Sequence, residues 1–148
     1  MGSSCSSYAR HHDTQPKPHQ QNKTYTYTPI DLDTNQIRHL HLVPAASDDE
    51  NIRCTLTFTS LKDNVQYEAL SYVWGQTSDT LWTINLEERL LAIRENLYSA
   101  LKHLRFKDHE RILWVDAICI NQHDLQERSH QVAAWALYTN KHHRLWYG

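Results

Sequence analysis

The feature that most constrains the fold is the apolar segment ILWVDAICI at residues 112–120. Both of its faces are apolar, which is typical of a strand covered on both sides in a mixed or parallel sheet. The preceding segment NLYSALKHLR, residues 96–105, repeats its leucines and alanine at the spacing of one helix face. A second helical segment follows from residue 125. This alternation of strands and helices predicts an α/β fold.

Short strand patterns dominate the chain before this region. NIRCTLTFTS alternates Ile52, Cys54, Leu56 and Phe58 with Arg and Thr, which predicts a strand with one wet face, antiparallel to its neighbour. The other predicted strands are IRHLHLVP (37–44), YEALSYVWG (67–75), a hairpin in LWTINLEERLLAI (81–93), and a last strand in HHRLWYG (142–148). Together they predict a mixed sheet with an antiparallel N-terminal extension and flanking helices.

Residues 1–24 are rich in Ser, His, Gln and Lys and have almost no aliphatic side chains. Such a segment cannot bury enough apolar surface to offset the entropy of ordering, so we expect a disordered arm before a domain at 25–148. The arm begins MGSSCS, which matches the N-myristoylation pattern at Gly2 and places Cys5 where a second acyl chain could attach. The alternative is a chance match in a serine-rich tail.

Composition narrows the class of protein. A formal net charge of −2 argues against a dedicated nucleic-acid binder, so no nucleic-acid partner is expected. Three widely spaced cysteines indicate free thiols in a reducing compartment. No apolar run is long enough for a membrane span or a secretory signal, which predicts a cytoplasmic protein. Eleven histidines raise the question of a metal, but Cys119 and His123 lack a second ligand pair, so no metal site is expected.

Two carboxylates stand where the second helix begins. Asp124 can accept a hydrogen bond from the N–H of Glu127, and Glu127 can reach back to the start of the helix. We favour this helix cap over a catalytic carboxylate pair. Val132 and Trp135 are expected on the buried face of this helix, with Glu127, Arg128 and Gln131 as a polar shoulder. The shoulder either bonds the loop above it or faces a ligand.

Polar residues also gather where predicted strands end. Asp116, the acid within segment 112–120, is expected near the carboxyl edge of the sheet, where open α/β sheets bind ligands. The alternative role for this acid is to brace the adjacent loop. The candidate ligand-binding residues are Ser71, Trp74, Gly75, Asp116, Asn121 and Gln122. The sequence lacks G-x-G-x-x-G and a Walker lysine, which excludes a standard dinucleotide or phosphate loop.

Two motifs carry a family resemblance. YEALSYVWG (67–75) and LWVDAICINQHDLQERSHQV (113–132) together resemble the fungal heterokaryon incompatibility (HET) domain, which reads roughly Y-x-x-L-S-Y-x-W-G and then W-[IV]-D-x-[IVL]-C-I-N-Q-x-D-x-x-E-R-x-x-Q-V. The resemblance implies a cytoplasmic module of fungal non-self recognition and cell-death signalling. It also implies a distantly TIR-like fold, and other HET or TIR-like domains as protein partners.

Some TIR relatives cleave NAD with a glutamate in a W-x-x-x-E-like context. In HET domains, the segment comparable to this one is a later R-x-W-x-x-Q-E. The sequence given ends at Gly148 before such a segment, so we expect only the N-terminal part of the domain. The resemblance thus implies a truncated or degenerate interaction module without enzymatic activity. Two alternatives stay open: a TIR-like enzyme that uses NAD, and an adaptor tethered to a membrane by acylated Gly2 and Cys5.

Overall fold

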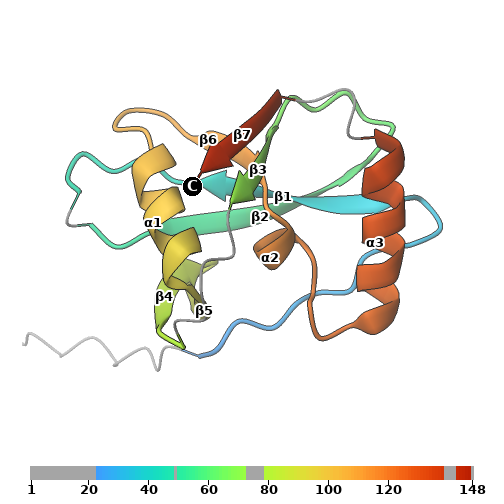
Figure 1. The fold of residues 1–148 in the computed structure, drawn as a ribbon, viewed down its shortest axis with the longest axis horizontal. Coiled ribbons are helices and arrows are strands. Elements are labelled where there is room, and N and C mark those ends of the chain that lie inside the picture. Colours follow the sequence, from blue (N-terminus) through green and yellow to red (C-terminus); the bar gives the residue numbers. More distant parts are fainter. Residues whose placement is uncertain (1–22, 49, 73–78, 139–142, 148) are drawn as a thin grey trace, which may run out of the picture.

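The computed structural model describes residues 23–48, 50–72, 79–138 and 143–147. In chain order the elements are β1 (Gln36–Leu42), β2 (Arg53–Ser60), β3 (Glu68–Tyr72), β4 (Leu81–Leu86), β5 (Arg89–Arg94), α1 (Glu95–Leu104), β6 (Arg111–Trp114), α2 (Asp116–Cys119), α3 (Leu125–Tyr138) and β7 (His143–Tyr147). Figure 1 shows α2 between α1 and α3.

The described strands form one sheet in the order β5-β4-β2-β1-β6-β3-β7. β1 is central and runs antiparallel to both β2 and β6. β3 runs parallel to β6 on one side and to β7 on the other, while β4 is parallel to β2 and antiparallel to β5. The predicted α/β class, the mixed sheet and the antiparallel pairing in the N-terminal half are confirmed.

The strand predicted at residues 112–120 is shorter than expected. β6 ends at Trp114, and Asp116–Cys119 forms the single-turn helix α2 after an extended Val115. Ile118 and Cys119 are fully buried in this helix. A short run that is apolar on every side fits a buried helix as well as a buried strand, so the sequence pattern could not separate the two.

α1 is the helix predicted from the NLYSALKHLR pattern. Its residues Leu97, Ala100 and Leu101 are buried, and it packs against β3, β4 and β5. Burying such a stripe supplies most of the stability of a ten-residue helix, because a helix this short is marginal alone. By contacting strands far apart in the sheet order, α1 fixes the hairpin of β4 and β5 against the rest of the sheet.

The β1 and β2 strands depart from simple alternation. Ile37, Arg38, His39 and Leu40 are all buried, because both faces of β1 are covered. On β2, Phe58 is 41% exposed instead of buried with the other apolar residues of its face. Its ring lies 5.6 Å from the guanidinium carbon of Arg38, so it covers a charged group at the margin of the core.

The first described residues of the chain pair with β5. Lys23 O accepts the Leu90 N–H at 3.0 Å, and the Tyr25 N–H donates to Leu90 O at 2.8 Å. Lys23, inside the arm predicted at 1–24, is therefore paired with β5. Gly2 and Cys5, the predicted acylation sites, lie outside the described residues. None of the helices in the described ranges is long and apolar enough to cross a membrane.

The predicted hairpin is present and has a strained turn. Leu86 pairs with Arg89, so Glu87 and Glu88 form a two-residue loop with φ of 52° and 63°. A type I′ loop requires positive φ at both positions, which favours Gly and Asn. The Glu87 carboxylate accepts the Leu56 N–H at 3.1 Å, so the Glu87 side chain bonds the backbone of β2. Glu88 is exposed.

Replacing Glu88 by glycine is expected to raise the free energy of unfolding by about 0.5–1 kcal/mol, since Gly removes the steric cost of positive φ. Urea denaturation of the purified chain measures this. Glu88→Ala is the matched control: it removes the same charge but keeps the Cβ, so it should give no gain. Equal stabilisation by both substitutions would show that charge, and not backbone strain, was responsible.

Candidate functional site

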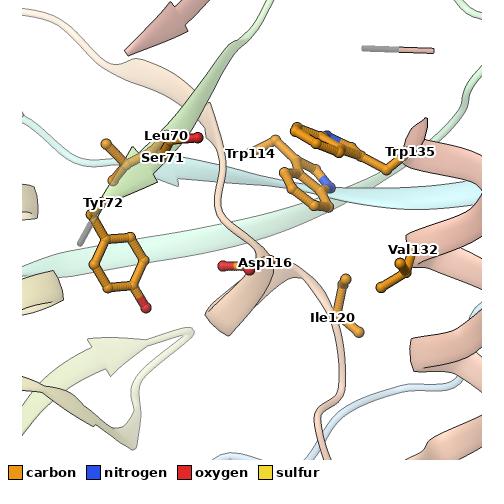
Figure 2. Close-up of a pocket in the computed structure, with 8 residues that line it drawn as sticks. All are labelled: Leu70, Ser71, Tyr72, Trp114, Asp116, Ile120, Val132 and Trp135. Atoms are coloured by element: carbon orange, nitrogen blue, oxygen red, sulfur yellow. The ribbon is translucent and has the colours of Figure 1, made fainter. Parts of the chain in front are cut away.

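A pocket lies at the carboxyl edge of the parallel strands β3 and β6. Ala69 pairs with Trp114, and beyond this pair the last residues of β3 bond, among the described strands, only β7, beside the start of α2. The cavity has a volume of about 360 Å³, within the range of small-molecule sites. It is lined by Leu70, Ser71, Tyr72, Trp114, Asp116, Ile120, Val132 and Trp135, shown in Figure 2.

The pocket has a polar and an apolar end. Figure 2 shows Ser71 and Tyr72 on one side, with Asp116 extending toward Tyr72. The indoles, together with Ile120 and Val132, form the other side. Trp114 and Trp135 are stacked, with ring centroids 5.2 Å apart and an interplanar angle of 17°. The arrangement suits a ligand that has an apolar part and a polar part.

Asp116 is the acid of this pocket. Burial raises the pKa of its carboxyl group, and the Ala117 N–H, which donates to Oδ1 at 2.7 Å, partly offsets the rise. Burial and the charge of Asp116 raise the pKa of Tyr72 to about 12, although Arg94 lowers it. A poorly solvated acid at the carboxyl edge of a sheet is a common property of functional sites.

The predicted ligand-binding residues separate into three groups. Ser71 and Asp116 line the pocket. Asn121 and Gln122 instead brace the loop: Gln122 Nε2 donates to Asp116 O at 2.8 Å, and Asn121 Oδ1 accepts the His123 N–H at 3.2 Å. The remaining two, Trp74 and Gly75, lie outside the described residues.

Sequence reasoning missed three aromatic residues of the pocket: Tyr72, Trp114 and Trp135. Tyr72 directly follows Ser71, which was a candidate, so its position at a strand end was available as a signal. Trp135 was assigned to the buried face of the helix, and nothing in the sequence places it opposite Trp114. Only the folded chain brings these two indoles together.

The start of α3 has the hydrogen bonds of a helix cap. Asp124 Oδ1 accepts the N–H groups of Gln126 and Glu127, each at 3.0 Å, as the D-x-x-E pattern predicts. The Glu127 side chain reaches back beyond the cap residue and accepts the Asn121 N–H at 2.8 Å. The two acids therefore have different functions: Asp124 satisfies free amides of the helix, and Glu127 holds the loop before it.

Glu127 also forms a buried ion pair with Arg38 of β1. Arg38 Nη1 donates to Glu127 Oε1, and Nη2 donates to Oε2 at 3.1 Å. The guanidinium further donates to Cys119 O at 3.0 Å and to Thr28 O at 2.7 Å, while the Tyr27 ring lies 5.0 Å from its carbon. A bidentate pair with additional acceptors is the geometry that compensates burial of two charges.

The polar shoulder predicted for α3 points inward. Glu127 and Gln131 are each 2% exposed, and Gln131 Nε2 donates to Gln36 O at 2.8 Å. Val132, predicted to be buried, is 59% exposed, whereas Arg128 is exposed as expected. The buried position predicted for Val132 was wrong. Of the two roles left open for the shoulder, Glu127 has the first, because it accepts the Asn121 N–H of the loop; its buried counter-ion lies on a distant strand, which helical periodicity does not indicate.

Among the described residues, no group of three or more His, Cys, Asp or Glu side chains could hold a metal ion. Cys119 is completely buried, and burial raises the pKa of its thiol to about 12. A thiol in this environment is a poor nucleophile.

Breaking the buried pair should be costly. Glu127→Gln leaves the Arg38 charge without its counter-ion and is expected to lower the free energy of unfolding by about 3–5 kcal/mol. Chemical denaturation measures the loss. The double variant Arg38→Met, Glu127→Leu should lose less than the sum of the two single changes, because no lone charge remains. Arg128→Gln, on the exposed side of the same helix, is the control and should change stability by less than about 0.5 kcal/mol.

Asp116→Asn should stabilise the chain in a pH-dependent manner. Because burial raises the pKa of Asp116, the folded chain binds this proton more tightly, and the free energy of unfolding falls as pH rises through the folded pKa. Asparagine keeps an acceptor for Ala117 and carries no charge. The variant should therefore gain more stability at pH 7 than at pH 4, whereas the exposed Asp33→Asn should show no such difference. A gain that is the same at both pH values would contradict this assignment.

Comparisons with known proteins place these features in a family. The model described as "Heterokaryon incompatibility protein (HET)" matches residues 67–143. Heterokaryon incompatibility protein 6, OR allele, of Neurospora crassa is 33% identical over 112 residues, covering 67% of this chain. The chain spans only 16% of that relative's length. No solved structure matches.

The HET match includes β3, whose last residues line the pocket, and the whole segment from β6 through α3. It covers more than half of the 148 residues. The chain therefore belongs to the heterokaryon incompatibility (HET) family.

Proposed function

We propose that the chain is a recognition module in fungal non-self recognition, the process named in its Neurospora relative. In this proposal it acts by binding a ligand or a partner in the cytoplasm and passes a cell-death signal on to other proteins. It does not itself catalyse a reaction. Membership of the HET family supports the process, and the geometry of the motif residues supports the mode of action.

The observation that carries the proposal is how the polar residues of the second motif are used. Asp124 caps α3, Glu127 neutralises Arg38, and Gln131 bonds the backbone of Gln36. None of these three lines the pocket, where Asp116 is the one carboxylate among the lining residues that the structure describes. A lone acid beside aromatic walls favours binding over catalysis by paired carboxylates.

Protein partners fit an outer edge of the sheet. In the described strand order β5 and β7 are the outer strands; Lys23 and Tyr25 already bond Leu90 of β5, so β7 is the one that we expect to accept a further strand from another chain. Other HET or distantly TIR-like domains are the partners that the family resemblance suggests. Acylation of Gly2 and Cys5 would also tether the module to a membrane surface.

A second candidate function is cleavage of NAD. The position of the pocket favours it, because nucleotides commonly bind outside the carboxyl ends of parallel strands. Asp116, close to Tyr72, would be the acid available for such chemistry. The two candidates differ in one measurable respect, namely whether the purified chain consumes NAD.

The test combines a genetic and a biochemical measurement. Deleting the gene in its fungus should allow stable heterokaryons with at least one strain that rejects the parent, and restoring the wild-type gene should restore rejection. Restoration with Asp116→Asn should fail, because the pocket has lost its charge, while Asp33→Asn should succeed. The purified chain should leave NAD intact.

Two results would contradict the proposal. Unchanged rejection of every tested strain after deletion would remove the role in non-self recognition. NAD consumption that disappears in Asp116→Asn but persists in Asp33→Asn would favour the enzyme over the binding module.

A further inference from the structure

We infer that the pocket between β3, α2 and α3 binds an organic cation, an ammonium or guanidinium head on an apolar stem. The inference rests on the proposed function and deepens it, since it names the ligand class of the same site. It combines three observations on the lining residues: an acid that forms no ion pair with another described residue, aromatic rings on both sides of the cavity, and an apolar extension of the cavity.

The first observation is the electrostatic environment of Asp116. Burial and the Ala117 N–H are the influences on its pKa, and no cationic side chain of the described residues is among them. Two of the described arginines have carboxylate partners of their own: Arg38 pairs with Glu127, and Arg111 pairs with Glu68 at 2.6 Å. Arg94 acts on Tyr72. Because a buried carboxylate is costly without a counter-charge, a cation supplied by a ligand would be favoured here.

The second observation is the aromatic lining. Tyr72, Trp114 and Trp135 contribute three rings to a cavity that also contains Asp116. Aromatic faces attract ammonium and guanidinium groups, most strongly where water is excluded. Combining rings with one acid discriminates in favour of cations: a neutral ligand would leave the carboxylate uncompensated, and an anion would be repelled by it.

The third observation is the division of the cavity into two ends. The charged head fits the end formed by Ser71, Tyr72 and Asp116, where the Asp116 carboxylate can accept its hydrogen bonds and the Tyr72 ring lies on the same side. The stem would lie along Ile120 and the stacked indoles. Val132, which is 59% exposed, lines this apolar end at the protein surface, so a stem attached to a larger molecule has a way out.

The experiment titrates the purified full chain with n-butylguanidinium and n-butylammonium, followed by calorimetry and by the fluorescence of the pocket indoles. The neutral isostere n-butylurea is the ligand control. We expect the cations to bind at least about tenfold more tightly than butylurea, as for loss of a charge-assisted contact. Asp116→Asn should remove this preference, and Asp33→Asn, with the same change in net charge, should keep it.

A second pair of variants separates the aromatic contribution from packing. Tyr72→Phe retains the ring and should retain binding, whereas Tyr72→Leu should weaken the cations several-fold with little effect on butylurea. Circular dichroism confirms that each variant is folded. Equal binding of butylurea and butylguanidinium, or full cation preference in Asp116→Asn, would overturn the inference.

The source of the cation is resolved in the same titration. A short alanine peptide with one central arginine is compared with its citrulline counterpart and with butylguanidinium. Tighter binding of the arginine peptide identifies a side chain of a partner protein, and binding of the free cation alone identifies a small amine. These results are separable from the heterokaryon test: absence of cation binding by the wild-type chain would overturn this inference, whereas loss of rejection on deletion of the gene would still support the role in non-self recognition.

Discussion

The ion pair between Arg38 and Glu127 is the interaction on which the rest of the structure depends. It joins the central strand β1 to the first turn of α3, and the same guanidinium also bonds the carbonyl groups of Thr28 and Cys119. Segments that are distant in sequence thus meet at one charged group. Two ions are expensive to bury, so the pair is favourable only when all of these partners are in place, which makes the fold cooperative around it.

The pocket depends on the same interaction. Its far wall consists of residues from the end of α2 and from α3, which the buried pair holds against the sheet. Glu127 also fixes the intervening loop through the Asn121 N–H, while Gln122 bonds the carbonyl group of Asp116. The most characteristic polar residues of the motif therefore position a site that other side chains line.

Prediction from the sequence succeeded where a pattern is local. The leucine stripe of α1, the hairpin of β4 and β5, and the Asp124 cap each depend on residues a few positions apart. It failed where the deciding contact is distant. The sequence did not indicate the partners of Glu127 and Gln131, because these lie about ninety residues away on β1. Likewise, Asp116 and Ser71 were candidates, but the tryptophan pair required the folded chain.

The central strand β1 lies outside the segment that identifies the family. The HET match spans residues 67–143 and leaves out β1 and β2, although β1 is the middle strand of the sheet. Glu127 lies inside the match and its counter-ion lies outside it. A relative that buries this glutamate in the same way needs a buried cation to pair with it, and the family match does not include the strand that supplies the cation here. In such a relative, we expect the counter-ion to be an arginine on a strand upstream of the first motif.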